Sequence, residues 1–264
     1  MKKIDGHMHL EYGDLSVEYV MEFVNRAKEV GLDKIQILDH THRFKEFYHL
    51  YDDLREIEVQ RKWLDNPQYK FHNTLDEFIA LKNEVQAMDL GIEVAFGLEI
   101  CYVPGQEELI RDIVSKHDFD FLVGSIHSID GRLYDMGFSK SILWDVIDTN
   151  TIYKRYYEIV FELVKSDLFD QIGHVDTIKM FNYYPTYDLT ETYKEFARLC
   201  KEHHVIVENN TGASFRYGHS DIGLNKELLK ILRDNGNEMI TASDSHRPFE
   251  VGTNIDKIYE ATML

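Results

Sequence analysis

The sequence has little cysteine, little proline and no long apolar run, and each scarcity excludes a class of protein. Only two of the 264 residues are cysteines, Cys101 and Cys200, and their separation fits neither a metal motif nor a disulfide framework. No apolar stretch approaches the length of a membrane span, and no basic-then-apolar leader opens the chain. No Pro-, Gly- or Ser-rich tract separates domains. We therefore expect a cytoplasmic protein without membrane contacts, in which residues 1–264 form one domain.

Positive charge is also scarce. The chain has 29 basic residues against 47 acidic ones, a formal net charge of −18. Binding to polynucleotides depends on neutralising phosphates with Lys and Arg, and no basic run with interleaved aromatic residues is present. A nucleic-acid partner is therefore not expected. A small anion can still bind where the site carries its own positive charge, and metal ions would supply that charge.

Strand-like and helix-like stretches alternate along the whole chain. We expect strands at residues 2–9, 34–39, 93–99, 120–127, 170–175, 203–209 and 238–244. Helical patterns follow each of them, and Ser16 and the capping box of Thr74 and Glu77 mark two helix starts. Strands joined through helices form a parallel sheet, although this pattern leaves open whether the sheet closes. Two segments, 41–73 and 128–150, interrupt the alternation, and long insertions of this kind usually build or cover a site.

Side chains that can bind metal recur at the ends of the predicted strands. His7 and His9 are two residues apart on the first strand, so both point to the same face. The carboxyl ends of parallel strands share one rim, where the site of such folds lies. Each candidate by itself is also consistent with a buried structural residue or a helix cap. Six of the seven predicted strands nevertheless deliver one to this rim, and those after the first strand are His40 with His42, Glu99, His127, His174, Asp244 and His246.

The kind of ligand indicates the kind of metal. Imidazole combined with carboxylate suits zinc, manganese or iron, and the absence of cysteine ligands argues against a structural zinc site. The candidates are too many for one ion with an open coordination position. A carboxylate such as Glu99 can bridge two ions about 3.5–4 Å apart, with a hydroxide between them. We therefore expect two or three divalent metal ions.

The chain resembles the polymerase-and-histidinol-phosphatase (PHP) superfamily in the order and spacing of its motifs. These motifs are His7-Met8-His9, Asp39-His40, Gly97-Leu98-Glu99, Gly124-Ser125-Ile126-His127, Gly173-His174-Val175-Asp176 and Ser243-Asp244-Ser245-His246. The similarity spans almost the whole chain. Residues 124–131 and Asn210-Thr211-Gly212 followed by Arg216 are most similar to the L-histidinol phosphate phosphatases of histidine biosynthesis. The resemblance implies an α/β fold, a distorted (β/α)7 barrel with a multinuclear metal site at the C-terminal rim of the strands.

The resemblance also implies a distribution of ligands. The expected sets are His7, His9, Glu99 and Asp244 for the first ion, Glu99, His127 and His174 for the second, and His40 and His246 for the third. Relatives usually place another histidine shortly after the first pair, in a loop that is shortened here to residues 10–14 and contains none. His42 is the expected substitute and Glu11 the alternative. Otherwise the third site is weak or empty, and His42 is a surface residue of the insertion.

The activity that the resemblance implies is the hydrolysis of L-histidinol phosphate, a small phosphate monoester, to L-histidinol and phosphate. A metal-bridging hydroxide would be the nucleophile, because coordination lowers the pKa of water to about 7. Glu99, Asp244 and His246 are the expected catalytic residues, with Asp244 or His246 assisting the leaving alkoxide. Arg216 and Arg155 are the expected phosphate ligands, although Arg155 is equally suited to a solvated helix face or to an ion pair with Glu158.

Other functions stay open at this point. The chain could hydrolyse another small phosphate ester, such as a nucleotide or a phosphotyrosine peptide, or it could bind metal without turnover. The complete ligand set with Arg216 favours an enzyme, because a storage site needs neither open coordination nor a phosphate ligand. The oligomeric state is unknown. The insertions also contain residues that could face the cationic groups of histidinol, although an ordinary surface position is the preferred interpretation of each: Asp52, Asp53, Asp130, Asp135 and Trp144.

Overall fold

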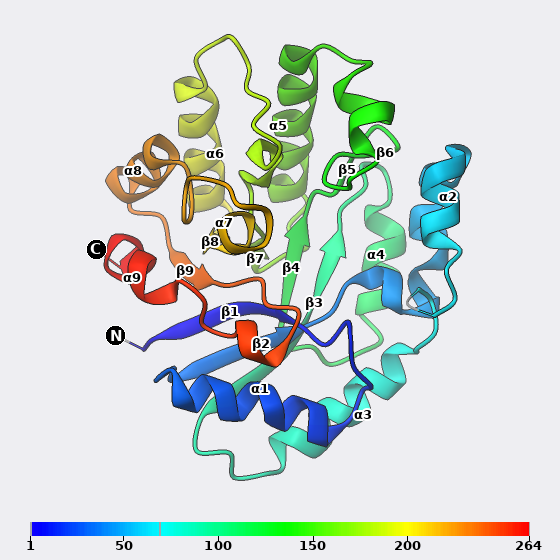
Figure 1. Cartoon of the computed structure of the whole chain (residues 1–264), viewed down its shortest axis with the longest axis vertical. Coiled ribbons are helices and arrows are strands. Elements are labelled where there is room, and N and C mark those ends of the chain that lie inside the picture. The colour runs from blue at the N-terminus through cyan, green and yellow to red at the C-terminus, as the bar shows by residue number, and fades with distance from the viewer. Residues whose placement is uncertain (1, 69, 264) are drawn as a thin grey trace.

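The computed structural model describes residues 2–68 and 70–263, and its central element is a sheet of seven parallel strands (Figure 1). Along the sheet the strands are β1 (Ile4–His9), β2 (Lys34–Leu38), β3 (Glu93–Cys101), β4 (Phe121–Ser125), β7 (Gln171–Ile172), β8 (Ile206–Asn210) and β9 (Met239–Ala242). All seven predicted strands are confirmed. Strand β7 is shorter than expected, because the backbone leaves the sheet before His174, whose φ is +27°.

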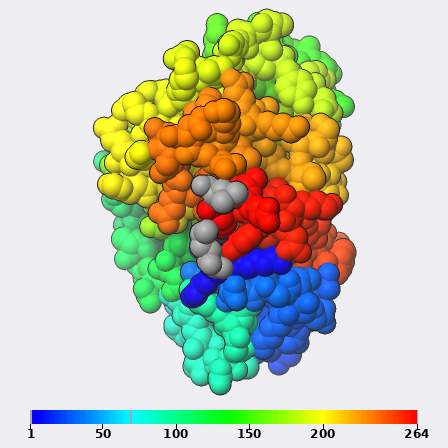
Figure 2. Space-filling view, turned by 90° about the vertical axis from the view of Figure 1, so that its left-hand side faces the viewer, coloured from blue at the N-terminus to red at the C-terminus, as the bar shows by residue number. Residues whose placement is uncertain are grey.

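The sheet closes into a nearly complete barrel. Strands β1 and β9 are the two ends of the strand order, yet the backbone N–H of His9 donates to the carbonyl of Ser245 at 2.7 Å, and that of Asp244 donates to the carbonyl of His7 at 2.9 Å. Figure 2 shows the blue N-terminal and red C-terminal parts of the chain beside each other on one face. The predicted (β/α)7 barrel is therefore confirmed.

Helices surround the barrel (Figure 1). They are α1 (Val17–Glu29), α3 (Leu75–Gln86), α4 (Glu107–Val114), α5 (Thr149–Lys165), α6 (Thr190–Glu202), α8 (Lys226–Asn235) and α9 (Ile255–Met263). The two predicted N-terminal caps are present: Ser16 Oγ accepts from the backbone of Tyr19, and Thr74 and Glu77 form a capping box. No helix in the described ranges has the length and apolar character needed to cross a bilayer.

Alternation along β3 explains why one face of the strand packs against the helices while the other faces the inside of the barrel. Val94, Phe96 and Leu98 belong to the large apolar core that packs the strands against the helices. Ala95 belongs to a small separate cluster, and Glu99 lies on the same side of the strand because residues two and four apart share a face. The strand therefore carries a carboxylate into the barrel while its other face is packed by apolar side chains.

The two insertions lie at the carboxyl ends of the strands. Residues 41–73 form short 3-10 turns and α2 (Glu58–Leu64), whereas residues 128–150 begin with a hairpin of β5 (Ser128–Ile129) and β6 (Arg132–Leu133). A further short helix, α7 (Gly212–Tyr217), follows β8. Sequence patterns did not predict these short elements, because each is too short to show a period.

Candidate metal centre

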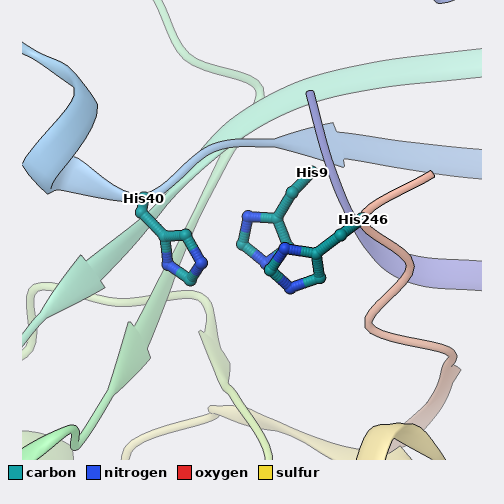
Figure 3. A group of neighbouring side chains, drawn as sticks. All are labelled: His9, His40 and His246. Atoms are coloured by element: carbon teal, nitrogen blue, oxygen red, sulfur yellow. The ribbon is translucent and has the colours of Figure 1, made fainter. Parts of the chain in front are cut away.

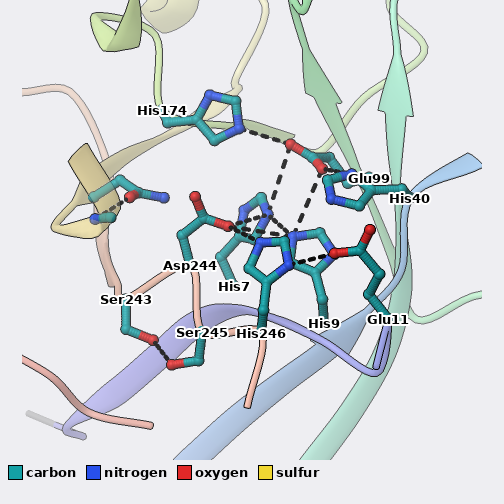
Figure 4. Close-up of polar contacts among 12 residues, drawn as sticks. His7, His9, Glu11, His40, Glu99, His174, Ser243, Asp244, Ser245 and His246 are labelled. Atoms are coloured by element: carbon teal, nitrogen blue, oxygen red, sulfur yellow. Dashed lines mark hydrogen bonds and ion pairs between the residues drawn. The ribbon is translucent and has the colours of Figure 1, made fainter. Parts of the chain in front are cut away.

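The predicted ligands converge at the C-terminal mouth of the barrel (Figure 4). Strands β1 and β3 turn His7, His9 and Glu99 inward, and the segments after β2, β4, β7 and β9 add the others. Within several groups, candidate ligand atoms lie within 4.8 Å of one another: His7 with Glu99 and His174, His7 with His9 and Asp244, His40 with Glu99 and His127, and His9 with His40 and His246. The structure thus brings together every residue of the first two predicted ligand sets.

Glu99 lies at the centre of this cluster and is 1% exposed. Its Oε1 is 2.7 Å from Nε2 of His174 and 3.2 Å from Nε2 of His127, and its Oε2 is 2.6 Å from Nδ1 of His40. Burial opposes ionisation, but the imidazoles of His127, His40 and His7 hold the pKa of Glu99 well below its usual range. The carboxylate is therefore ionised and available to cations on both of its oxygens.

Three imidazoles of the cluster are each backed by a second carboxylate. Because an ionised carboxylate only accepts hydrogen bonds, the Nδ1 atom facing it must donate, and Nε2 keeps its lone pair for a cation. The pairs are His7 Nδ1 with Glu208 at 2.7 Å, His127 Nδ1 with Asp135 at 2.9 Å, and His246 Nδ1 with Glu11 at 2.7 Å. Such outer carboxylates fix the orientation and tautomer of metal-binding histidines.

The free lone pairs point at further carboxylates. Nε2 of His127 is 3.2 Å from Glu99 Oε1, and Nε2 of His246 is 3.3 Å from Asp244 Oδ1. A lone pair facing a carboxylate oxygen requires a cation between them, which is a proton in the absence of metal. Accordingly, although burial opposes protonation of His7, the carboxylates of Glu208 and Glu99 raise its pKa to about 10. This donor set of imidazole nitrogens and carboxylate oxygens fits divalent ions such as zinc.

A second observation supports the same fit. Glu99 Oε2 is buried and accepts no hydrogen bond within the described part of the chain, although Nδ1 of His40 is only 2.6 Å away. Two polar atoms that approach without a hydrogen bond are expected where both are directed at one shared ion. Figure 3 shows the rings of His9, His40 and His246 close to one another. The ring centroids are 4.0 Å apart for His9 and His40 and 4.3 Å apart for His9 and His246.

The predicted third ligand set is only partly reproduced. His40 and His246 share a group with His9, whereas His42 joins a different group with Glu11 and His40. His42 is 7% exposed and its ring lies 4.6 Å from that of His40, so the surface alternative for His42 is wrong. However, both ring nitrogens of His42 face the amine of Lys70, at 3.0 and 3.3 Å.

The cluster lines a cavity of about 260 Å³. Both insertions contribute to its wall, through residues such as Trp63 and Met136, which confirms that they build the site. Arg216 of α7 also lines the cavity, with its Nη1 3.3 Å from the carbonyl oxygen of Asp244 and 3.5 Å from its Oδ2. Gly212 permits this approach, because a β-carbon there would lie 2.7 Å from Asp244 Oδ2. The other donors of the Arg216 guanidinium make no hydrogen bond among the described residues.

The structure does not bring Arg155 to the cavity. Its guanidinium lies 2.9 Å from Asp130, 3.3 Å from Glu158 and 3.2 Å from Glu162. The alternative of a helix-face ion pair therefore describes Arg155, since its position on α5 is outside the cavity wall and three carboxylates already engage its donors. Of the insertion residues considered for a cationic substrate, Asp135 lines the cavity, whereas the described wall does not include Asp52, Asp53, Asp130 or Trp144.

Sequence patterns did not identify Glu208 and Lys70, two buried residues of the site. They also gave too little weight to Glu11 and Asp135. Glu208 lies in β8 directly after the apolar run 205–207, and a carboxylate in that position was the only signal for it. Glu11 continues the two-residue spacing of His7 and His9. Lys70 lies in an irregular segment, where no periodicity indicates which side chain turns inward.

Replacing Glu208 with Gln is expected to weaken zinc binding about 10- to 100-fold, the usual effect of losing an outer-shell partner. Glu208 Oε1 accepts from His7 and from the side chain of Gln171, and Oε2 accepts from the backbone N–H of His174 and the side chain of Asn210. An amide must present its NH2 group to one of these donor pairs, so the imidazoles lose their alignment. Competition with a chromophoric chelator measures the change in Kd.

The matched control for this substitution is Glu238→Gln. Glu238 is exposed just before β9, and its substitution removes the same charge without touching the cluster. Zinc affinity should be unchanged in this control. Equal affinity in the Glu208 variant and the wild type would contradict a positioning role for Glu208.

Comparison with known proteins agrees with the fold and the motifs. A histidinol phosphate phosphatase of Lactococcus lactis, solved in complex with zinc, L-histidinol and phosphate, superposes with a TM-score of 0.72 at 20% identity, covering 99% of this chain and 92% of that one. The Listeria monocytogenes protein hisK, assigned as a histidinol phosphatase, gives a TM-score of 0.77 at 20% identity, covering 97% and 99%. At these identities the two structures establish the fold.

Sequence relatives extend across the same length. A protein of Deinococcus radiodurans named a probable histidinol-phosphatase is 25% identical over 252 residues, which cover 94% of this chain and 88% of that protein. A Schizosaccharomyces pombe protein of the same name is 24% identical over 267 residues, covering 95% and 83%. The PHP domain model matches residues 5–212, the segment that runs from β1 through β8. With its motifs, barrel and convergent ligands in agreement with that match, the chain belongs to the PHP domain family.

Proposed function

We propose that this chain is a metal-dependent phosphomonoesterase that hydrolyses L-histidinol phosphate to L-histidinol and phosphate. The observation that carries the proposal is the convergence of imidazoles and carboxylates on one cavity that also contains the guanidinium of Arg216. The relatives named probable histidinol-phosphatase and the neighbour complexed with zinc, L-histidinol and phosphate support this choice of substrate.

Divalent ions, when bound, would lower the pKa of a coordinated water to about 7, so that hydroxide is available as a nucleophile at neutral pH. They would also neutralise charge on the phosphoryl oxygens. The residues placed to hold them are those of the cluster: His7, His9, His40, Glu99, His127, His174, Asp244 and His246. Glu99 is suited to bridge two positions, since its Oε1 and Oε2 face different imidazoles. Its buried site excludes water from the inner side of the cluster.

The other roles belong to the cavity wall. Arg216 offers its unengaged donors to the phosphate oxygens, while Asp244 holds the guanidinium in place. Asp244 and His246 both line the cavity, and we propose that one of them passes to the leaving alkoxide the proton that the attacking water gives up. Asp135, behind His127, supplies a negative charge for the cationic groups of the substrate, and the Trp63 ring supplies an apolar part of the cavity wall.

Arg216→Ala is expected to lower kcat/KM for histidinol phosphate by about 10²- to 10³-fold, the usual loss when a preorganised donor to developing charge is removed. Arg216→Lys should recover only part of the activity, because an ammonium cannot form the two parallel hydrogen bonds of a guanidinium. Steady-state kinetics of phosphate release measures both. Arg155→Ala is the comparison, and a loss there as large as for Arg216 would contradict the assignment of the phosphate ligand.

A substrate panel tests the proposed function directly. Phosphate release is measured from histidinol phosphate, p-nitrophenyl phosphate and mononucleotides, each with added zinc and with a chelator. The expected result is release that the chelator abolishes and a kcat/KM for histidinol phosphate well above the others. Comparable rates on all esters would contradict histidinol phosphate as the substrate. No release from any ester with metal present would instead favour a metal-binding protein without turnover.

A further inference from the structure

Lys70 brings a positive charge into the wall of the metal centre, although burial lowers the pKa of its amine to about 8. The residue is 7% exposed, and it lines the cavity from the insertion 41–73. Its amine is 3.0 Å from Nε2 of His42, 3.6 Å from Glu11 Oε1 and 4.3 Å from the centroid of the Trp63 ring. A buried ammonium is stable only with such partners, and here two of the three are the residues that a third metal ion would require.

The contacts of Lys70 leave Glu11 and His42 little capacity for a metal. Glu11 Oε2 accepts from Nδ1 of His246 at 2.7 Å, and Glu11 Oε1 faces Lys70, so both oxygens are engaged. A neutral imidazole has one acceptor nitrogen, and both nitrogens of His42 face the amine of Lys70. A lone pair that accepts a hydrogen bond from the ammonium is not free to bind an ion.

The remaining imidazoles sort into two sets around two carboxylates. Around Asp244 Oδ1 lie the Nε2 atoms of His7 at 3.7 Å, His9 at 3.3 Å and His246 at 3.3 Å. Around Glu99 lie His127 and His174, at 3.2 and 2.7 Å from Oε1, and His40, at 2.6 Å from Oε2. His9, His40 and His246 also lie close enough together to form a group of their own. A neutral imidazole has one lone pair and binds one ion at a time, so two ions, one in each set, would use all six imidazoles.

We propose that the centre of this chain holds two divalent ions, and that the ammonium of Lys70 occupies the place of a third. The inference rests on the metal centre of the proposed function but not on its substrate. The Glu11–His42 corner, defined here as Glu11, His42 and Lys70, is then a closed ion-pair network beside the two ions. It supplies a positive charge to the cavity without a metal, and removing the lysine frees Glu11 Oε1 and His42 to bind a further ion.

Metal counting by mass spectrometry tests the proposal on the full chain. The protein is loaded with excess zinc, freed of unbound metal and analysed for zinc per chain. The wild type should hold two ions, and Lys70→Ala should hold three. Lys70→Arg, which keeps the charge, and the double variant K70A/H42A, which removes a ligand of the opened site, should each hold two. Lys62→Ala, at an exposed lysine of α2, is the matched surface control.

Three ions in the wild type would overturn the proposal, as would fewer than two, or a count in Lys70→Ala that stays at two. The wild-type count decides even where a variant does not fold, and anomalous scattering from zinc in crystals of the wild type locates the ions independently. Failure of the proposed function would be seen separately. A protein that holds two ions but releases no phosphate from histidinol phosphate would contradict the proposed substrate and leave the two-ion centre with Lys70 in place.

Discussion

Replacing Glu99 with Gln is expected to reduce phosphate release by on the order of 10³-fold or more, because a bridging carboxylate both holds the ions and balances their charge. The zinc content should also fall, since Glu99 contacts imidazoles on each of its oxygens. The substitution is isosteric, so the barrel is expected to fold. Zinc per chain and kcat/KM, measured on the same preparation, check both effects.

The matched control for this change lies on the same strand. Glu93 begins β3 at its exposed end and pairs with Lys2 and Lys34. Glu93→Gln removes the same charge far from the cluster, and its activity should stay close to that of the wild type, because a surface substitution usually changes stability by no more than about 0.5 kcal/mol. A Glu99 variant with wild-type zinc content and activity would contradict the central position of this carboxylate.

Removing the metal is expected to abolish activity and to lower thermal stability together. The ions bind the folded chain only, so ions present at about 1,000 times their Kd contribute about 4 kcal/mol to the free energy of unfolding. Without them the cluster must place protons between lone pairs and carboxylates, as the pKa of about 10 for His7 indicates. Thermal unfolding and phosphate release, each with chelator and after restoring zinc, measure the two effects.

The Glu99→Gln variant is the control for the stability effect. Because its centre holds less metal, the chelator should shift its Tm less than it shifts that of the wild type. A chelator-treated protein, shown to be metal-free, that keeps full activity would contradict the metal-dependent mechanism. Equal Tm shifts in the two proteins would show that the chelator acts away from Glu99.

The parallel strands and most of the ligands were predictable because their signals are local. A strand that ends in His or Asp carries its ligand to the rim wherever the strand lies in the sheet, and His7 and His9 share a face by alternation alone. The same reasoning could not separate Arg216 from Arg155. Both follow strands, but α7 places Arg216 against Asp244, whereas α5 surrounds Arg155 with the carboxylates of Glu158 and Glu162.

The third ligand set shows more clearly what sequence patterns cannot predict. We expected His42 rather than Glu11 as the substitute ligand, yet the partners of both residues lie many positions away along the chain. His246 reaches Glu11 from 235 positions away, and Lys70 reaches His42 from 28 positions further along the same irregular insertion. Whether a buried nitrogen or oxygen is free for a metal depends on such partners, and sequence spacing carries no information about them.

By itself, the sequence determined the order of strands and helices, the rim on which the ligands gather and the chemistry of those ligands, because each follows from local periodicity and residue type. Only the tertiary structure decided the closure between β1 and β9, the outer carboxylates of Glu208 and Asp135, and the position of Lys70. These depend on contacts between distant segments, where packing and the pairing of buried charges select the partners.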